Sequence, residues 1–98
     1  MIAQRWGAQP ALSLGLEEEV FILDADTLEL TPGVETLVAG AADRALPGRL
    51  KTELHASVVE LNTNPAETAA EAIASLSRLR AGAVEIASAA GLAIAAAG

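Results

Sequence analysis

The stretch Leu12 to Leu23 constrains the fold most, because after Gly15 its side chains alternate with the period of two that is typical of a β-strand. This alternation sorts the side chains onto two faces of the strand. One face carries Leu16, Glu18, Val20 and Ile22, and the other carries Glu17, Glu19, Phe21 and Leu23. Glutamate is depleted in strands and neighbouring like charges repel, so three consecutive glutamates need something that compensates them.

Turn and periodicity signals divide the middle of the chain into shorter elements. The turn residues Asp24 to Thr27 predict a hairpin into a short strand, Leu28 to Leu30. Apolar residues at helical spacing predict a helix from Val34 to Ala42, and Pro47-Gly48 marks the loop that follows it. From Lys51 to Asn62 the sequence favours extended structure again.

A long helix is predicted for the second half of the chain. Asn64 is the expected N-cap, with Pro65 at the first helical position and Glu67 at the third. Gly91 is expected to end the helix, and Leu92 to Ala97 reads as a further strand. One stripe of the helix is apolar and is expected to form core or a subunit contact. It comprises Ala69, Ile73, Leu76, Leu79, Ala83, Ile86 and Ala90.

The fold class expected from these elements is α+β, an antiparallel sheet with one long and one short helix. At 98 residues the chain is one domain at most, and with one Phe, one Trp and no Tyr it can bury little apolar area. We therefore expect marginal stability alone, so that the chain either associates or is a piece of a larger protein.

Charge and composition exclude several classes of partner. A formal net charge of −7 disfavours nucleic acid, whose affinity for proteins comes largely from Lys and Arg contacts to phosphates. No membrane helix is expected, because the alanine-rich segment from Ala81 to Gly98 contains Glu85 and two further interruptions by glycine. The absence of cysteine and of a secretory signal pattern fits a cytoplasmic protein.

Glu17 and Glu19 would point to the same side of a strand, with their roots about 6.6 Å apart. At about 7 Å two such charges repel by roughly 0.6 kcal/mol in water, but by roughly 2.4 kcal/mol at an effective dielectric constant of 20. On a solvated face the pair is harmless. On the concave side of a sheet it needs protonation, an arginine or a metal ion.

A second acidic pair, Glu53 and Glu60, lies seven residues apart. This odd offset would send the two side chains to opposite faces of a regular strand, whereas a bulge or a helical turn between them would bring both to one side. Four glutamates on two neighbouring elements would form an all-oxygen site suited to magnesium or manganese.

The ordered motifs carry a resemblance to a known family. Two acidic motifs occur in order, Gly15-Leu16-Glu17-Glu18-Glu19-Val20-Phe21 and, after Glu53, Val59-Glu60-Leu61-Asn62-Thr63. They are followed by a helix that ends in Gly-Leu and by an alanine-rich strand. This order resembles the N-terminal portion of the type-2 glutamate-cysteine ligase family. These proteins are also described as ATP-dependent carboxylate-amine ligases. The resemblance extends from Leu14 to the end of the sequence.

The resemblance implies a partial glutamine synthetase-like fold, with an antiparallel sheet that curves around an ATP site. It also implies that residues 1–98 form a single partial domain, the N-terminal part of a larger catalytic domain. Glu17 and Glu19 match the first metal-binding pair of the family, and Glu53 and Glu60 match the second. Magnesium, with manganese as an alternative, would then be the compensation for the clustered carboxylates, and the parent enzyme would bind ATP and an amino acid.

The family pattern also continues beyond Gly98, with a Gly-x-His-Pro-like segment and later basic residues. The isolated chain is therefore expected to supply part of a metal site and to be inactive alone. Glu18 is expected to be a surface residue or a salt-bridge partner, and His55 either a structural hydrogen-bonding residue or a neighbour of a metal ligand.

Two other functions are compatible with the residues. The chain could be a non-catalytic module whose long helix mediates self-association into a homo-oligomer, with solvated carboxylates. It could also be an acidic domain that binds a basic protein. A metal-dependent change in melting temperature would favour the ligase hypothesis over self-association, and salt-sensitive association with a cationic partner would indicate the acidic domain.

Overall fold

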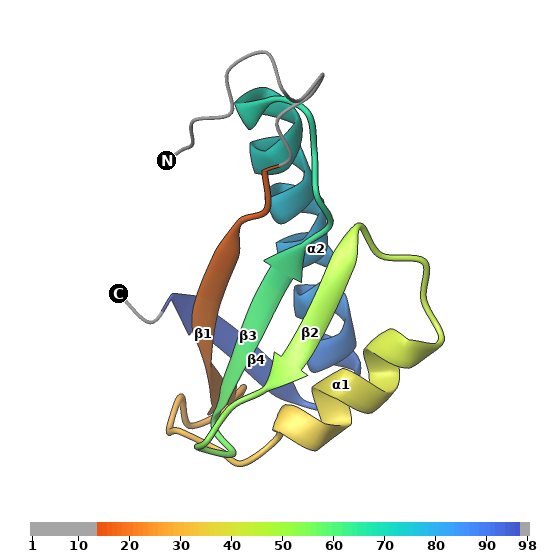
Figure 1. The fold of residues 1–98 in the computed structure, drawn as a ribbon. Coiled ribbons are helices and arrows are strands. Elements are labelled where there is room, and N and C mark those ends of the chain that lie inside the picture. The colour runs from red at the N-terminus through yellow and green to blue at the C-terminus, as the bar shows by residue number, and fades with distance from the viewer. Residues whose placement is uncertain (1–13, 97–98) are drawn as a thin grey trace.

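A computed structural model describes residues 14–96 as an antiparallel sheet covered on one face by two helices (Figure 1). The elements follow in the order β1 (Glu17–Asp24), α1 (Val34–Ala42), β2 (Gly48–Thr52), β3 (Val58–Thr63), α2 (Ala69–Ala89) and β4 (Leu92–Ala96). The strand order across the sheet is β2-β3-β1-β4, and every pairing is antiparallel. The α+β class expected from the sequence is confirmed.

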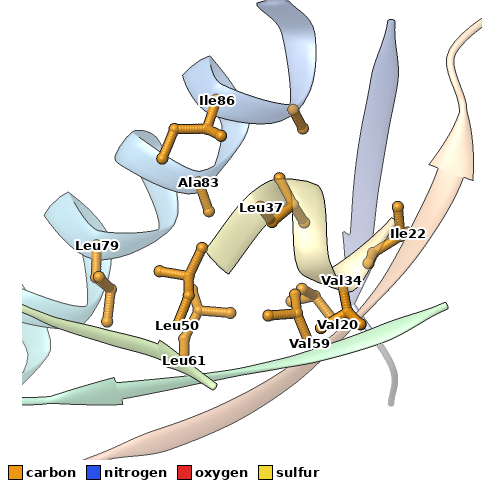
Figure 2. Packing of buried hydrophobic residues seen from close by; sticks show 11 residues of the cluster. Val20, Ile22, Val34, Leu37, Leu50, Val59, Leu61, Leu79, Ala83 and Ile86 are labelled. Atoms are coloured by element: carbon orange, nitrogen blue, oxygen red, sulfur yellow. The ribbon is translucent and has the colours of Figure 1, made fainter. Parts of the chain in front are cut away.

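The core lies between the helices and one face of the sheet. In Figure 2 the side chain of Leu79 on α2 points toward the strands, and Leu37 on α1 and Ile86 on α2 belong to the same cluster, with Ile86 packed against Gly40 of α1. The strands contribute alternate residues that point back at the helices: Val20 and Ile22 from β1, Val59 and Leu61 from β3, and Leu50 from β2. Because a strand alternates its side chains, residues Glu17, Glu19 and Phe21 must lie on the opposite face.

We call this opposite side the open face, because among residues 14–96 no helix packs on it. It carries Glu17, Glu19, Phe21 and Leu23 from β1, Val58, Glu60 and Asn62 from β3, and Arg49 and Lys51 from β2. In Figure 1 α2 passes behind β2 and β3, so these strands are seen from the open side. The division of β1 into two faces is as the sequence predicts.

Several predicted elements have the predicted bounds. Helix α1 spans Val34–Ala42, with Val34 and Leu37 buried, because the apolar spacing is local and matches the helical period. Helix α2 ends before Gly91, whose φ of +76° is a backbone conformation that glycine adopts without strain. Strand β4 then runs to Ala96, and the predicted residue 97 lies outside the described residues, as do residues 12 and 13 of the predicted first strand.

The predicted strand Leu28 to Leu30 is wrong. Leu28 has a φ of +63°, and Asp24 Oδ1 accepts hydrogen bonds from the N–H groups of Asp26 and Thr27, which folds this segment into a turn. Only a single bridge, Leu23 to Leu30, returns the chain to β1. The segment is a loop that leads into α1.

The extended stretch from Lys51 to Asn62 is likewise two strands rather than one. Residues 53–57 form a loop, in which the N–H of Val58 donates to the carbonyl oxygen of His55 at 3.1 Å. Strands β2 and β3 therefore form a hairpin, and the observed order is strand, helix, strand, strand, helix, strand. The predicted order placed the hairpin at the first strand instead.

The N-cap of the long helix is Thr68, not Asn64. Thr68 Oγ1 accepts a hydrogen bond from the N–H of Glu71 at 3.0 Å, as an N-cap side chain should. The helix cannot start at Pro65, because Ala66 forms a β-bridge with Leu14. In this bridge the N–H of each residue donates a hydrogen bond to the carbonyl oxygen of the other. Ile73, predicted on the buried stripe, is 61% exposed, whereas the stripe is correct at Leu79, Ala83 and Ile86.

Candidate metal centre

The site is built on the central strand pair of the sheet. Strand β1 and strand β3 pair antiparallel, with Glu19 directly opposite Glu60 and Glu17 directly opposite Asn62. On the same face, side chains that are directly opposite have Cβ atoms about 4.5–5.5 Å apart. The register therefore brings two carboxylates from separate strands together on the open face.

Glu53 joins this pair from the loop that follows β2. One carboxylate oxygen each from Glu19, Glu53 and Glu60 lie within 4.8 Å of one another. We call these three residues the acidic trio. Glu19 is exposed, while Glu53 and Glu60 are half-buried. The hairpin resolves the ambiguous spacing of seven, because Glu53 lies in its loop, directly after β2, whereas Glu60 lies on β3.

The chemistry of the acidic trio suits a hard divalent cation. Carboxylate oxygens are the ligands that magnesium and manganese prefer. An ion that binds oxygens at about 2.1 Å spans roughly 4.2 Å between opposite ligands. The 4.8 Å limit on the trio is close to this span, so small side-chain rotations bring the oxygens into range. The residues therefore fit a magnesium or manganese ion.

Glu17 does not join the acidic trio, although it was predicted with the other three as a ligand. It lies on the same face of β1 as Glu19 and is exposed, in a row with Asn62 on β3 and Arg49 on β2. The structure thus brings together three of the four predicted carboxylates. The role of Glu17 as a metal ligand stays a prediction.

Glu18 lies on the helix side of the sheet and forms an ion pair there, which is one of the two roles predicted for it. Arg80 of α2 donates to Glu18 Oε1 through Nε at 3.0 Å and through Nη2 at 2.9 Å. The three consecutive glutamates of β1 therefore have two different environments. Two face the open side, and one links the sheet to α2.

Two residues near the trio were not singled out by the sequence as parts of the site. Lys51 Nζ lies 4.0 Å from Glu60 Oε1, and the Asn62 Nδ2 atom is buried with no hydrogen-bond partner in the structure. The position of Lys51 opposite Glu60 depends on the register of the β2–β3 hairpin, and no local signal reveals that register. His55, predicted as a possible neighbour of a metal ligand, is exposed in the loop that follows Glu53.

Two pockets in the described part of the chain are lined by residues other than the trio. A cavity of about 350 Å³ is lined by residues at the start of α1, including Gly33, Glu35 and Ala56. A second, of about 280 Å³, lies between α2 and the β1–β4 edge and is lined by Glu18, Arg80 and Val84 among others. The acidic trio is instead a feature of a sheet surface. None of the helices within residues 14–96 is long and apolar enough to cross a bilayer.

Comparison with known proteins gives a consistent result. A family model described as Glutamate-cysteine ligase family 2 matches residues 13–98. A Rubrobacter xylanophilus protein named "Putative glutamate--cysteine ligase 2-3" is 42% identical over 78 residues, which are 79% of this chain and 21% of that protein. Proteins named "Putative glutamate--cysteine ligase 2" from Chloroflexus aurantiacus and Sorangium cellulosum are each 39% identical, over 90% and 88% of this chain. The chain spans 22% and 23% of these two relatives.

Proposed function

The chain belongs to glutamate-cysteine ligase family 2, and from this premise we propose that it supplies metal-binding carboxylates to an ATP-dependent carboxylate-amine ligase of the glutamate-cysteine type. Magnesium is the proposed ion, with manganese as an alternative. The chain spans only about a fifth of the length of its curated relatives, so the proposal concerns one part of such an enzyme. Contacts to the nucleotide and the two substrates would come largely from the remainder of such an enzyme.

The observation that supports this proposal most is the convergence of Glu19, Glu53 and Glu60 on the open face. Each comes from a different part of the chain, and each offers a carboxylate oxygen to the same small volume. Without a cation, opposed carboxylates such as Glu19 and Glu60 destabilise a strand pair. An arrangement that costs stability is expected at a functional site.

The proposed reaction forms an amide in two steps. An oxygen of a substrate carboxylate attacks the γ-phosphorus of ATP, the bond to the β,γ-bridging oxygen breaks, and ADP leaves with that electron pair. The nitrogen of the amine then attacks the carbonyl carbon of the acyl phosphate, inorganic phosphate leaves, and the nitrogen loses a proton. The transition state of the first step spreads negative charge over the phosphoryl oxygens, so catalysis depends on positioning and on charge stabilisation.

The acidic trio would hold the divalent ion at this reaction. The ion, when bound, neutralises charge on the phosphoryl oxygens. Glu19 and Glu60 are fixed by the β1–β3 ladder, so they would hold the ion with little reorganisation, while Glu53 lies at the start of a loop. Glu18 would act only through its ion pair with Arg80, which joins β1 to α2.

The arrangement of layers also supports the proposal. Both helices pack on one face of the antiparallel sheet and leave the carboxylate-bearing face open to a nucleotide (Figure 1). A glutamine synthetase-like sheet that curves around ATP would use its inner face in this way. The cytoplasm is the proposed compartment, because the reaction consumes ATP and the chain contains no cysteine.

Substitution of the trio in the full-length enzyme tests the proposal. We expect Glu19→Gln and Glu60→Gln to lower kcat by at least about 100-fold and to raise the magnesium concentration needed for half-maximal rate. Glu18→Gln is the matched control on the other face of the same strand, and it should keep the rate within about twofold. Wild-type rates for Glu19→Gln and Glu60→Gln, measured as ADP release that depends on both substrates, would remove the metal role.

A second candidate function is self-association through α2. Ile73 and Val84 are 61% and 47% exposed and are eleven positions apart, which places them on nearly the same side of the helix. Exposed apolar residues on one side of a helix can contribute to a contact surface when a partner covers them. Sedimentation would show an oligomer that is indifferent to divalent metal and is lost in the double variant Ile73→Lys and Val84→Lys.

A further inference from the structure

Lys51 occupies a defined place beside the acidic trio. It lies on β2 directly opposite Glu60 on β3, and Glu60 lies directly opposite Glu19 on β1. The three side chains therefore form one row across three strands on the open face. Lys51 Nζ is 4.0 Å from Glu60 Oε1, with the lysine side chain 51% exposed and the glutamate side chain 18% exposed.

Among the other lysine and arginine residues of the described chain, two are paired elsewhere, Arg78 lies on α2, and Arg49 lies in another row of the sheet. Arg80 pairs with Glu18 on the helix side of the sheet, and Arg44 pairs with Glu85 on α2. Arg49 lies on β2 in the neighbouring row, opposite Asn62. Within residues 14–96, Lys51 is the basic residue that forms an ion pair with a member of the trio.

We infer that Lys51 is a built-in counter-cation of the trio, which contends with the divalent ion for Glu60 and thereby sets the metal affinity of the site. This inference rests on the proposed function and deepens it. Three carboxylates and one ammonium sum to a charge of −2, so the lysine compensates part of the repulsion before a metal ion binds. When the ion binds Glu60, the ion pair between the Lys51 ammonium and the Glu60 carboxylate must break.

The physical character of the pair suits an exchangeable contact. A pair at 4.0 Å with a half-exposed lysine is weak, because solvent screens it and the long side chain loses entropy on being held. The lysine stem can therefore swing into solvent at low cost, leaving Glu60 free to bind the ion. A buried or bidentate arginine pair in the same place would oppose metal binding far more strongly.

Direct titration of the full-length protein with Mn²⁺ tests this inference, by following the paramagnetic resonance signal of the free ion without nucleotide or substrate. Lys51→Met keeps the aliphatic stem and removes the charge. We expect it to tighten Mn²⁺ binding by about three- to tenfold, because a repulsive unit charge close to the ion is lost. In the metal-free state the same variant should melt at a lower temperature than wild type, and saturating Mn²⁺ should raise its melting temperature by more.

Arg49→Met is the matched control, since it removes one positive charge from the same strand and the same face, two residues away. It should change Mn²⁺ affinity by less than about twofold. Unchanged or weaker binding in Lys51→Met overturns the inference, and so does an equal gain in Arg49→Met, which would indicate an effect of net charge alone.

The inference and the proposed function fail in distinguishable ways. If wild type binds Mn²⁺, Glu60→Gln loses that binding and Lys51→Met does not tighten it, then only the role of Lys51 is wrong. If Mn²⁺ binding to wild type does not depend on Glu19 or Glu60, then the metal site of the proposed function is wrong and the inference falls with it.

Discussion

Glu19 on β1 and Glu60 on β3 are directly opposite residues of an antiparallel strand pair, with their carboxylates on the open face of the sheet. The register of the sheet therefore creates the acidic trio, and a slip of one residue in either strand would turn one of these carboxylates toward the helices. The same register places Lys51 beside Glu60. Residues that fix the β2–β3–β1 register consequently position the site.

Gly48 is one such residue. It lies opposite Thr63, and a Cβ atom added there would be 2.2 Å from the carbonyl oxygen of Asn62 and 2.8 Å from the Thr63 Cα atom. Because both contacts are with backbone, Gly48→Ala must displace β2 from β3, and we expect a loss of about 1–3 kcal/mol in the free energy of unfolding. Chemical denaturation of Gly48→Ala and wild type measures this loss. At Gly15 the nearest contact of an added Cβ is 3.5 Å, so Gly15→Ala should cost less than about 0.5 kcal/mol.

The N-cap of α2 gives a second prediction. Thr68 Oγ1 accepts a hydrogen bond from the Glu71 N–H, so Thr68→Ala should lower the free energy of unfolding by about 1 kcal/mol. Asn64→Ala is the informative comparison, because the sequence alone favours Asn64 as the cap. It should cost less than about 0.5 kcal/mol. A larger loss for Asn64→Ala than for Thr68→Ala would show that the helix begins earlier.

Thr63 ties the segment before β1 to β3. Its side chain is buried, and Oγ1 accepts a hydrogen bond from the Leu16 N–H at 2.8 Å. Thr63→Val keeps the shape of the side chain but leaves that N–H without a partner, which should cost about 1–3 kcal/mol. Hydrogen exchange at the Leu16 amide should be faster in Thr63→Val than in Thr63→Ser, which keeps the hydroxyl. Equal protection in the two variants would argue against this hydrogen bond.

Asp24 gives a pH-dependent prediction. Hydrogen bonds from the backbone N–H groups of Thr27 and Asp26 to its carboxylate hold the pKa of Asp24 below its ordinary value of 3.8. A carboxylate whose pKa is lower in the folded state stabilises the protein above its unfolded pKa, and this contribution is lost as the pH falls through the folded pKa. Asp24→Asn should therefore be less stable than wild type at pH 7. The difference in free energy of unfolding between the two proteins should shrink once the pH is below both the folded and the unfolded pKa of Asp24. A difference that persists undiminished in strong acid would contradict this.

The local parts of the fold could be predicted from the sequence. Helix α1 has the predicted bounds because the spacing of Val34 and Leu37 is a short-range pattern. The two faces of β1 follow from alternation, and Glu18 consequently pairs with Arg80 on the helix side. The strand predicted at Leu28 to Leu30 was wrong because of a local turn held by Asp24, but the start of α2 was wrong because a distant segment decides it. Ala66 could not start a helix because it pairs with Leu14, and no signal near Ala66 reveals this.

The candidate site was predictable to a smaller extent. The spacing of Glu53 and Glu60 left their faces undecided, and the family resemblance, rather than periodicity, paired them with Glu19. The hairpin loop of residues 53–57 is what brings Glu53 to the trio. Lys51 could not be identified in advance, because its neighbour depends on which residue of β3 stands opposite. Long-range register thus determines what the local sequence could not show.

Titration of the wild-type protein with Mn²⁺ alone, alongside Glu60→Gln and Glu18→Gln, tests the central claim most directly. We predict that wild type and Glu18→Gln bind the ion at one shared site and that Glu60→Gln weakens this binding by at least about tenfold, because the central member of the trio loses its charge. Equal Mn²⁺ affinity in wild type and Glu60→Gln would contradict the account.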